Sequence, residues 1–359
     1  GHSLEAIPIT RGEITIPARS AGIVISPLAF QMNVLLLHPF SDASLARLQA
    51  GMPGAIVSRC ASLADASPEA LAEADILFVS DSRKLPLPEQ TPRLAWLQGY
   101  WAGIDHVIGQ PIFGGGRVRL TTSAGTHAVV MSEFALMMML NLAHRFSELL
   151  HWRASGGPGG WPINRRSYRT NVLDGATLGL VGYGAVGNRI ATLGAALGMR
   201  IMAMRGRQAV VGAAAPGEPP VTWFQRDGLG KLAAEADYLV IVAALTAQTR
   251  RMISADVLAL MKPSAYLVNI ARGEIIDEPA LIEALRTHRI AGAALDVFET
   301  EPLPSSSPLW DLDNVILTPH VSGMAPDYES RVVDIFIDNY QYYVTGKRMP
   351  TEVDFERGY

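Results

Sequence analysis

Residues 177–187 read TLGLVGYGAVG, and this stretch decides the fold. An apolar run typical of a buried strand leads into Gly182, Gly184 and Gly187, and a stretch with helical periodicity follows. In a strand–turn–helix unit, the first glycine permits a tight turn, the second lets the backbone approach a pyrophosphate, and the third lets helix and strand pack closely. The N–H groups at the helix start are then available to the phosphates. The sequence therefore predicts a dinucleotide site formed by Gly182, Tyr183, Gly184, Ala185, Val186 and Gly187.

The next expected strand, residues 200–204, indicates which dinucleotide binds. A site specific for NAD usually places Asp or Glu at the end of this strand, where the carboxylate binds the ribose 2′-OH. Here Arg205, Gly206 and Arg207 follow, and no acid is present. Arginine pairs with a 2′-phosphate, which a carboxylate would repel. We therefore predict that Arg205 and Arg207 bind NADP(H) in preference to NAD(H), with NAD(H) as the open alternative.

Short apolar runs alternate with helical stretches on both sides of this unit. Upstream, strands are expected at residues 34–37, 55–57, 76–80 and 94–98, with helices at 44–50 and 68–74. Further strands are expected at 177–181, 200–204, 238–243, 265–269, 291–295 and 315–317, with helices at 186–197, 256–260 and 278–285. This alternation is typical of parallel sheets covered by helices on both faces. The predicted fold is α/β, with two doubly wound, Rossmann-like domains and the active site in the cleft between them.

Two segments are expected to connect the domains. Residues 126–152 form a long apolar stretch, and residues 326–343 read as an amphipathic helix that returns to the first domain. We therefore expect a discontinuous, flavodoxin-like substrate-binding domain from residues 32–125 and 322–359. Residues 126–321 would form the dinucleotide-binding domain.

Composition excludes several classes of protein. The chain has 359 residues, 49% apolar and 18% charged, which suits two well-packed domains. A net charge of -4 predicts no nucleic-acid partner, and the single Cys60 excludes an intramolecular disulfide and leaves no thiolate metal cluster. The most apolar stretch, residues 128–143, is shorter than the roughly 20 residues that a bilayer requires. Without a basic start leading into an apolar core, no signal peptide is indicated, and we expect a cytoplasmic protein without a membrane or metal site.

Residues 1–31 are treated as an N-terminal extension. They contain short β-like runs, and Gly1, His2 and Ser3 are typical of a cloning remnant. Two origins stay open for this extension: native sequence, or vector-derived sequence ahead of a natural start at Met32.

Three separated residues carry the chemistry that the sequence suggests. Arg272 lies in VNIARG, Glu301 in DVFETEP and His320 in TPHVSG. A fixed cation, a carboxylate and an imidazole are what a site needs to hold a 2-keto acid and to protonate its carbonyl oxygen. With a dinucleotide loop upstream, they indicate hydride transfer.

From Met32 onward these segments resemble the D-isomer-specific 2-hydroxyacid dehydrogenases. The shared motifs are, in order, the glycine loop, LTAQT (245–249), MKP (261–263), NIARG (269–273), DE (277–278), ALDVF (294–298), EPL (301–303), PLW (308–310) and TPH (318–320). Within the family the chain looks most like the NADPH-dependent glyoxylate/hydroxypyruvate reductases, to which the run GRQ at residues 206–208 is similar.

The resemblance implies a role for each site residue. Arg272 binds the substrate carboxylate and polarises the keto oxygen, and His320 is the acid–base residue, oriented by Glu301. Asp296 holds the nicotinamide carboxamide, and Ala271 also contacts the cofactor. The backbone N–H groups of Ala102 and Gly103 bind the substrate carboxylate.

The implied reaction is the NADPH-dependent reduction of glyoxylate or hydroxypyruvate to a D-2-hydroxy acid, by a homodimer. Two alternatives stay open: another 2-hydroxyacid or phosphonate dehydrogenase of the same fold, or a dinucleotide-sensing, corepressor-like binding protein. Two tryptophans bear on the substrate. Trp101 stands where the family more often has a small residue, and we expect its ring to narrow the pocket. Trp161 is a candidate for an aromatic side chain that reaches an active site.

Overall fold

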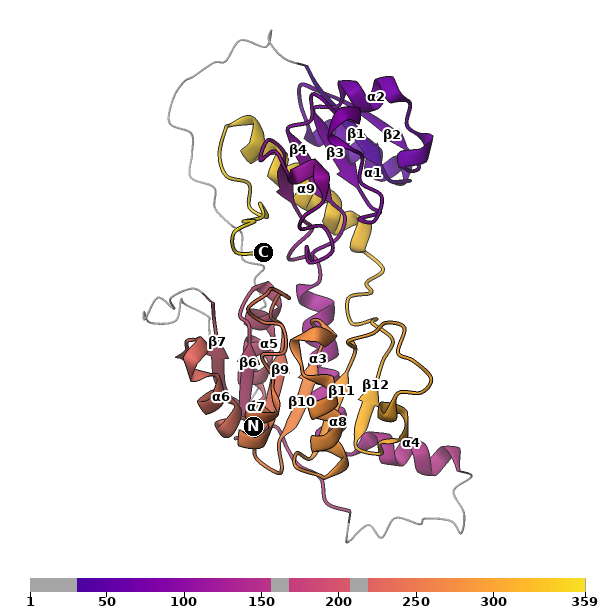
Figure 1. Cartoon of the computed structure of the whole chain (residues 1–359). Coiled ribbons are helices and arrows are strands. Elements are labelled where there is room, and N and C mark those ends of the chain that lie inside the picture. Colours follow the sequence, from indigo (N-terminus) through magenta and orange to yellow (C-terminus); the bar gives the residue numbers. More distant parts are fainter. Residues whose placement is uncertain (1–30, 156–167, 207–218, 359) are drawn as a thin grey trace, which may run out of the picture.

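The computed structural model describes residues 31–155, 168–206 and 219–358, which form two α/β lobes, one above the other (Figure 1). The first sheet has the order β2-β1-β3-β4-β5, the flavodoxin-like order, and all of its pairs are parallel. Its strands are β1 (Met32–Leu37), β2 (Ala55–Cys60), β3 (Ile76–Val79), β4 (Trp96–Gly99) and β5 (Arg119–Thr121).

The second sheet is also parallel, in the order β12-β11-β10-β9-β6-β7-β8. Its strands are β6 (Thr177–Val181), β7 (Arg200–Met204), β8 (Val221–Phe224), β9 (Tyr238–Ile241), β10 (Tyr266–Asn269), β11 (Gly292–Leu295) and β12 (Val315–Leu317). When the strands of this lobe are numbered in chain order and read from β8, they run 3-2-1-4-5-6-7. The first six follow the dinucleotide-binding order. The predicted α/β class with two doubly wound sheets is confirmed.

Helices cover both sheets and begin where the sequence provides caps. Side chains of Ser41, Ser67, Ser254 and Asp277 accept hydrogen bonds from backbone N–H groups in the first turns of four helices. The helices are α1 (Asp42–Gly51), α2 (Pro68–Glu73), α3 (Ala128–Ala143), α4 (Phe146–Ala154), α5 (Ala185–Ala196), α6 (Leu229–Glu235), α7 (Ala255–Leu260), α8 (Glu278–Arg286) and α9 (Tyr328–Val344). None of the described helices is long and apolar enough to cross a membrane.

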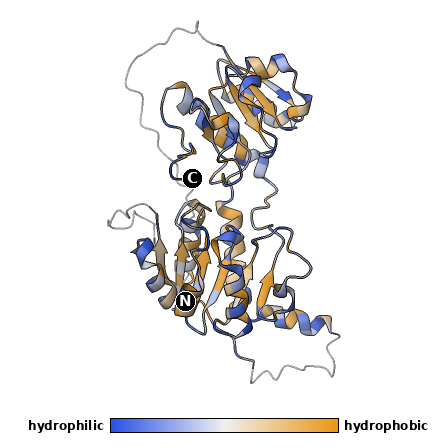
Figure 2. Cartoon of the chain, viewed as in Figure 1, coloured by the Kyte–Doolittle hydropathy of each residue, from blue (hydrophilic) through white to orange (hydrophobic). Residues whose placement is uncertain are grey.

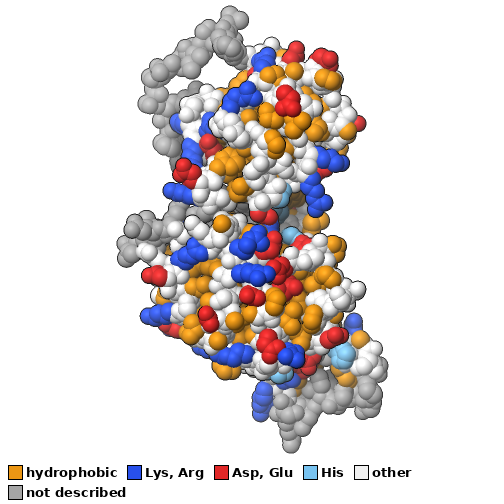
Figure 3. Space-filling model, viewed as in Figure 1, with side chains coloured by type: hydrophobic (Ala, Val, Ile, Leu, Met, Phe, Trp, Pro, Cys, Tyr) orange, Lys and Arg blue, Asp and Glu red, His pale blue; other side chains and the backbone are white. Residues whose placement is uncertain are grey.

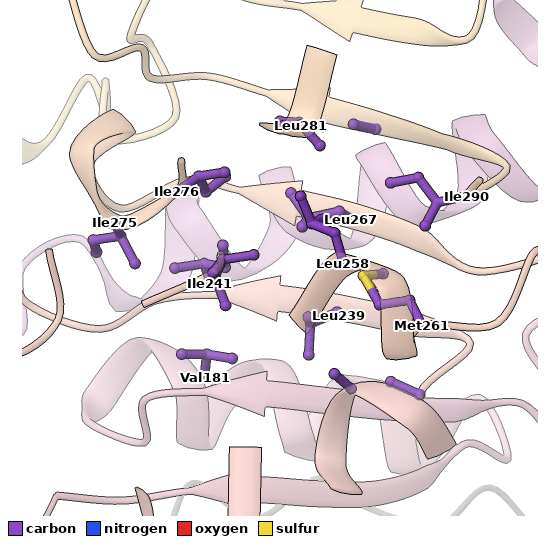
Figure 4. Close-up of a cluster of buried hydrophobic side chains, with 14 of the residues drawn as sticks. Val181, Leu239, Ile241, Leu258, Met261, Leu267, Ile275, Ile276, Leu281 and Ile290 are labelled. Atoms are coloured by element: carbon purple, nitrogen blue, oxygen red, sulfur yellow. The ribbon is translucent and has the colours of Figure 1, made fainter. Parts of the chain in front are cut away.

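The core lies on both faces of each sheet. The central strands are apolar throughout, whereas the helices are polar on one side (Figure 2). In the largest cluster, side chains from successive strands of the second sheet, such as Val181, Ile241 and Leu267, lie beneath Leu258 and Met261 of the α7 region (Figure 4). The sheet is thus rigid up to the carboxyl ends of its strands, where loops project toward the other lobe.

The long helix α9 returns to the first lobe. Its buried residues Val332, Val333, Phe336 and Tyr340 belong to the same core cluster as strands β1 and β3. Segments at the two ends of the described chain therefore build one lobe, as the amphipathic pattern of residues 326–343 predicts.

Short elements account for most differences from the sequence prediction. Strands β5 and β8 and helix α6, which have three to seven residues, were not expected from the sequence. The apolar stretch 126–152 forms two helices, because Arg145 adopts a left-handed conformation with φ +53° between α3 and α4. The β-like runs expected within residues 1–31 lie outside the described residues.

A glycine sets the spacing between the loops that follow β10 and β11. A Cβ on Gly273 would lie 1.9 Å from the carbonyl carbon of Phe298 and 2.3 Å from the nitrogen of Glu299. Both are backbone atoms, so the two loops can approach this closely only because residue 273 has no side chain.

We expect Gly273→Ala to lower the free energy of unfolding by about 2–3 kcal/mol, the usual cost of overpacking. The measurement is urea denaturation followed by circular dichroism. Gly115→Ala is the matched control, because a Cβ there would meet no described atom within 4 Å, and its effect should stay within about 1 kcal/mol. An unchanged midpoint for Gly273→Ala would show that these loops are free to move apart.

Candidate active site

The glycine loop joins β6 to α5 at the carboxyl end of the second sheet (Figure 1). Gly182 has φ +102°, and a Cβ there would lie 2.7 Å from the nitrogen of Ala243. Gly187 is also confined, because its Cβ would lie 2.8 Å from the carbonyl oxygen of Gly182. At Gly184, by contrast, a Cβ would meet no described atom within 4 Å. The backbone is therefore open where a pyrophosphate has to approach the first N–H groups of α5, and these residues fit that group.

Arg205 follows β7 directly, beside the glycine loop. The nitrogen of Gly182 donates to the carbonyl oxygen of Met204, 3.1 Å away, which ties the loop to the end of β7. The side chain of Arg205 is exposed. Arg207 lies outside the described residues, so only the first of the two predicted arginines is placed.

His320 and Glu301 form a close pair. Nδ1 of His320 lies 2.7 Å from Oε2 of Glu301, while Oε1 accepts a hydrogen bond from the backbone nitrogen of Phe298 at 3.0 Å. An ionised carboxylate can only accept, so the imidazole carries its proton on Nδ1 and Nε2 remains for another partner. His320 has φ +53°, a strained conformation for a residue with a side chain, of the kind that clusters at functional sites.

Asp296 holds the loop that carries His320. Its carboxylate is 1% exposed and accepts hydrogen bonds from Thr318 Oγ1 at 2.7 Å and from the nitrogens of Val321 and Ser322 at 3.0 and 2.9 Å. The nitrogen of His320 donates to the backbone oxygen of Asp296 at 2.9 Å. A buried charge has to be satisfied in this way. The cofactor contact predicted for Asp296 would use the acceptor capacity that remains on Oδ2.

Arg272 is held through two nitrogens of its guanidinium. Nε donates to Oδ1 of Asp105, across the cleft, at 3.2 Å, and Nη1 donates to the carbonyl oxygen of Ala271 at 2.9 Å. Asn269, fully buried, braces this segment by donating to the carbonyl oxygen of Arg272 at 2.9 Å and accepting from the nitrogen of Ala271 at 3.1 Å. Nη2 and the second N–H of Nη1 are the donors left for a ligand.

Ala102 and Gly103 bring the first lobe to Arg272. A Cβ on Gly103 would lie 2.2 Å from Nη2 of Arg272, so a side chain there would displace the guanidinium from its position. Within the described chain, the N–H groups of Ala102 and Gly103 have no hydrogen-bond acceptor. Both residues line a cavity of about 450 Å³ that also reaches Ala244 in the second lobe. Charged side chains and imidazoles gather at this waist between the lobes (Figure 3).

Asp105 is held ionised by its neighbours. Burial opposes ionisation of the carboxyl, but the neighbouring imidazole of His106, whose Nδ1 lies 3.9 Å from Oδ2, and the positive charge of Arg272 outweigh it and lower the pKa of Asp105 to about 2. The ion pair between the lobes is therefore present at any pH above that range.

The two tryptophans that bear on the substrate are placed differently. The ring of Trp101 turns back onto its own lobe, where it would lie 2.6 Å from a Cβ on Gly99 and packs against the core cluster beneath β4. The ring therefore fills space against the sheet, and the expected narrowing of the pocket stays a prediction. Trp161 lies outside the described residues.

Sequence reasoning missed three residues that organise this site. Asp105, Asn269 and Thr318 each bond a predicted site residue or its segment. Asn269 and Thr318 stand at or just after strand ends of a parallel sheet, where functional side chains gather, and that position was the available signal. No local signal in the sequence marked Asp105, because its partner Arg272 is 167 positions away.

Comparison with known proteins gives consistent results. The sequence model of the D-isomer specific 2-hydroxyacid dehydrogenase NAD binding domain matches residues 136–322. A protein of Aeropyrum pernix named glyoxylate reductase is 34% identical over 292 residues, which is 79% of this chain and 84% of the relative.

Two solved structures are similar along almost the whole chain. A D-isomer specific 2-hydroxyacid dehydrogenase family protein from Aeromonas salmonicida has a TM-score of 0.74 and 32% identity, covering 91% of this chain and 100% of the other. A D-isomer specific 2-hydroxyacid dehydrogenase from Xanthobacter autotrophicus, in complex with NADPH and MES, has a TM-score of 0.75 and 27% identity, covering 92% and 100%. The chain belongs to the D-isomer specific 2-hydroxyacid dehydrogenase family and is an NAD(P)-binding oxidoreductase.

Proposed function

We propose that the protein reduces small 2-keto acids, such as glyoxylate and hydroxypyruvate, to D-2-hydroxy acids with NADPH. The observation that supports the proposal is the His320–Glu301 pair in the second lobe, together with Arg272, whose guanidinium meets Gly103 and Asp105 of the other lobe. A paired imidazole and a cation are the groups that keto-acid reduction needs. The relative named glyoxylate reductase supports the choice of substrate.

The cofactor preference is part of the proposal. Its supports are the open backbone at Gly184, the exposed Arg205 at the end of β7 and the NADPH in the Xanthobacter autotrophicus structure. Residues 182–187, Ala271 and Asp296 would contact the dinucleotide, and Arg205 and Arg207 its 2′-phosphate. When bound, reduced nicotinamide supplies the hydride.

The chain's own residues would bind the acid and move the proton. The N–H groups of Ala102 and Gly103 and the end-on edge of Arg272, formed by Nη1 and Nη2, bind the substrate's carboxylate and keto oxygen. His320 donates a proton to that oxygen, and Glu301 keeps the imidazole oriented. The substrate would meet the Nη1–Nη2 end of the guanidinium, because Asp105 already accepts from Nε.

The domain roles and location follow the same proposal. Residues 32–125 and 322–359 would bind the substrate, and residues 126–321 the dinucleotide. A cytoplasmic location, expected from the sequence, is part of the proposal too.

We also propose a homodimer that forms through α3 and α4. None of the side chains of α4, all of which are described, is buried, although Phe146 and Leu150 are large and apolar. Met137 and Leu140 of α3 are exposed as well. Helix α4 projects from the lower lobe (Figure 1), and an apolar surface of this kind usually marks an interface.

The first test is reduction of glyoxylate, hydroxypyruvate, pyruvate and phenylpyruvate, followed by the loss of nicotinamide absorbance. We expect NADPH-linked turnover of the two smallest acids, and His320→Gln should lower kcat by roughly 10²–10⁴-fold, the usual contribution of a general acid. The Kd of NADP⁺, measured by calorimetry, should stay within about twofold. Bound cofactor without turnover of any acid would instead favour the phosphonate or sensor alternatives.

The second test concerns the ion pair between the lobes. Asp105→Ala should raise the KM for glyoxylate about tenfold, because Arg272 loses the partner that fixes its orientation. Asp105→Asn should stay within about threefold of the wild type, since its amide oxygen can still accept from Nε. Asp338→Ala, which removes an exposed carboxylate from α9, is the control. Equal KM values for all three variants would remove Asp105 from the site.

The third test is the mass in solution by light scattering. We expect a dimer for the wild type and a monomer for the double variant Phe146→Glu/Leu150→Glu, because two carboxylates cannot be buried at an apolar interface. Leu260→Glu, which replaces an equally exposed leucine on α7, should leave the dimer intact. A wild-type monomer, or a dimer that survives both changes, would rule out this interface.

A further inference from the structure

Three side chains outside the catalytic group form a compact cluster at the edge of the second sheet. The guanidinium carbon of Arg205 lies 5.6 Å from the ring centre of Tyr183 and 5.8 Å from that of Trp223. The two rings meet edge to face, 4.7 Å apart. Tyr183 belongs to the glycine loop, Arg205 follows β7, and Trp223 lies in β8, so three separate segments converge on one guanidinium.

The sheet register explains why they meet. Trp223 is paired with Ala203, and Phe224 with Met204. Because side chains alternate along a strand, residues 203 and 205 share a face with Trp223. The backbone nitrogen of Arg205 also donates to the carbonyl oxygen of Phe224, 3.4 Å away, which ties it to β8.

The aromatic rings are fixed, whereas the arginine is exposed. Tyr183 is 8% exposed, and its hydroxyl accepts a hydrogen bond from Nδ2 of Asn188 in α5. Trp223 packs against the core cluster beneath the glycine loop. The rings therefore offer a rigid support to a side chain that otherwise has many rotamers.

The guanidinium of Arg205 lies within cation–π distance of both rings. Attraction to an aromatic ring does not use up the N–H donors of a guanidinium, which lie in the plane of the group. Arg205 thus retains its donors for an anion beside the glycine loop, and less conformational entropy is lost when that anion binds.

We propose that Trp223 is a positioning residue for cofactor selection: with Tyr183, it holds Arg205 where the guanidinium meets the 2′-phosphate of an adenine dinucleotide. This inference rests on the proposed preference for NADPH. It assigns part of that preference to a strand, β8, that contributes no group to the catalytic site described above.

Binding of the 2′-phosphate can be measured apart from binding of the adenosine and the 5′-phosphate. Calorimetry with 2′,5′-ADP and 5′-AMP does this, because the two nucleotides differ only in the 2′-phosphate. Trp223→Leu should weaken 2′,5′-ADP about fivefold, the usual scale of a cation–π contact, and leave 5′-AMP within twofold. Trp223→Phe, which restores an aromatic face, should recover binding to within twofold. In turnover, the KM for NADPH should rise with the same ratio while kcat changes little.

A double-variant cycle shows whether Trp223 acts through Arg205. In an Arg205→Leu background, Trp223→Leu should have no further effect on 2′,5′-ADP, because the group that it positions is gone. The inference is overturned if Trp223→Leu binds 2′,5′-ADP like the wild type, weakens both nucleotides equally, or adds fully to Arg205→Leu. If Arg205→Leu itself leaves 2′,5′-ADP binding unchanged, the proposed role of Arg205 in NADPH preference fails as well, which distinguishes the two failures. Circular dichroism checks that each variant is folded, and Trp223→Met replaces Trp223→Leu if the latter unfolds.

Discussion

The buried carboxylate of Asp296 is the constraint on which the geometry of the site depends. Its two oxygens accept three hydrogen bonds from Thr318, Val321 and Ser322, and leaving them unpaired would cost several kcal/mol. The loop after β12 therefore packs against the end of β11. Within this loop, His320 adopts a left-handed conformation. Strain at His320 persists because the contacts on either side of it determine the loop.

The second constraint couples the lobes. Arg272 bonds Asp105 across the cleft, and the two crossing segments are joined where Nδ1 of His127 lies 3.1 Å from the carbonyl oxygen of Gly323. Burial lowers the pKa of His127, and the hydrogen bond with Gly323 opposes that shift only in part. A neutral imidazole donates from one nitrogen only. The contact between His127 and Gly323 therefore fixes the direction in which the chain leaves the loop that carries His320.

The fold and the site differ in how far the sequence could predict them. Glycine spacing and apolar runs were enough for two parallel sheets, because each signal lies within about ten residues. The pairing of His320 with Glu301 was also expected, since both stand in family motifs. Asp105 was not, because an ion pair between residues 167 positions apart leaves no local pattern. Strand β8 was also not predicted: its residues Val221–Phe224 do not form a buried apolar run, and a long connection separates it from its partner β7.

The arrangement separates two tasks in space. The residues proposed for proton transfer lie on loops after β10, β11 and β12, whereas the cluster of Arg205, Tyr183 and Trp223 lies at the opposite edge of the same sheet, around β7 and β8. A change in the aromatic support should alter the orientation of one arginine without moving Asp296 or the loop that carries His320, because among the described residues the two groups lie on strands at different edges of the sheet. The free-energy changes caused by one substitution in each group should therefore be additive, as they are for sites without shared partners.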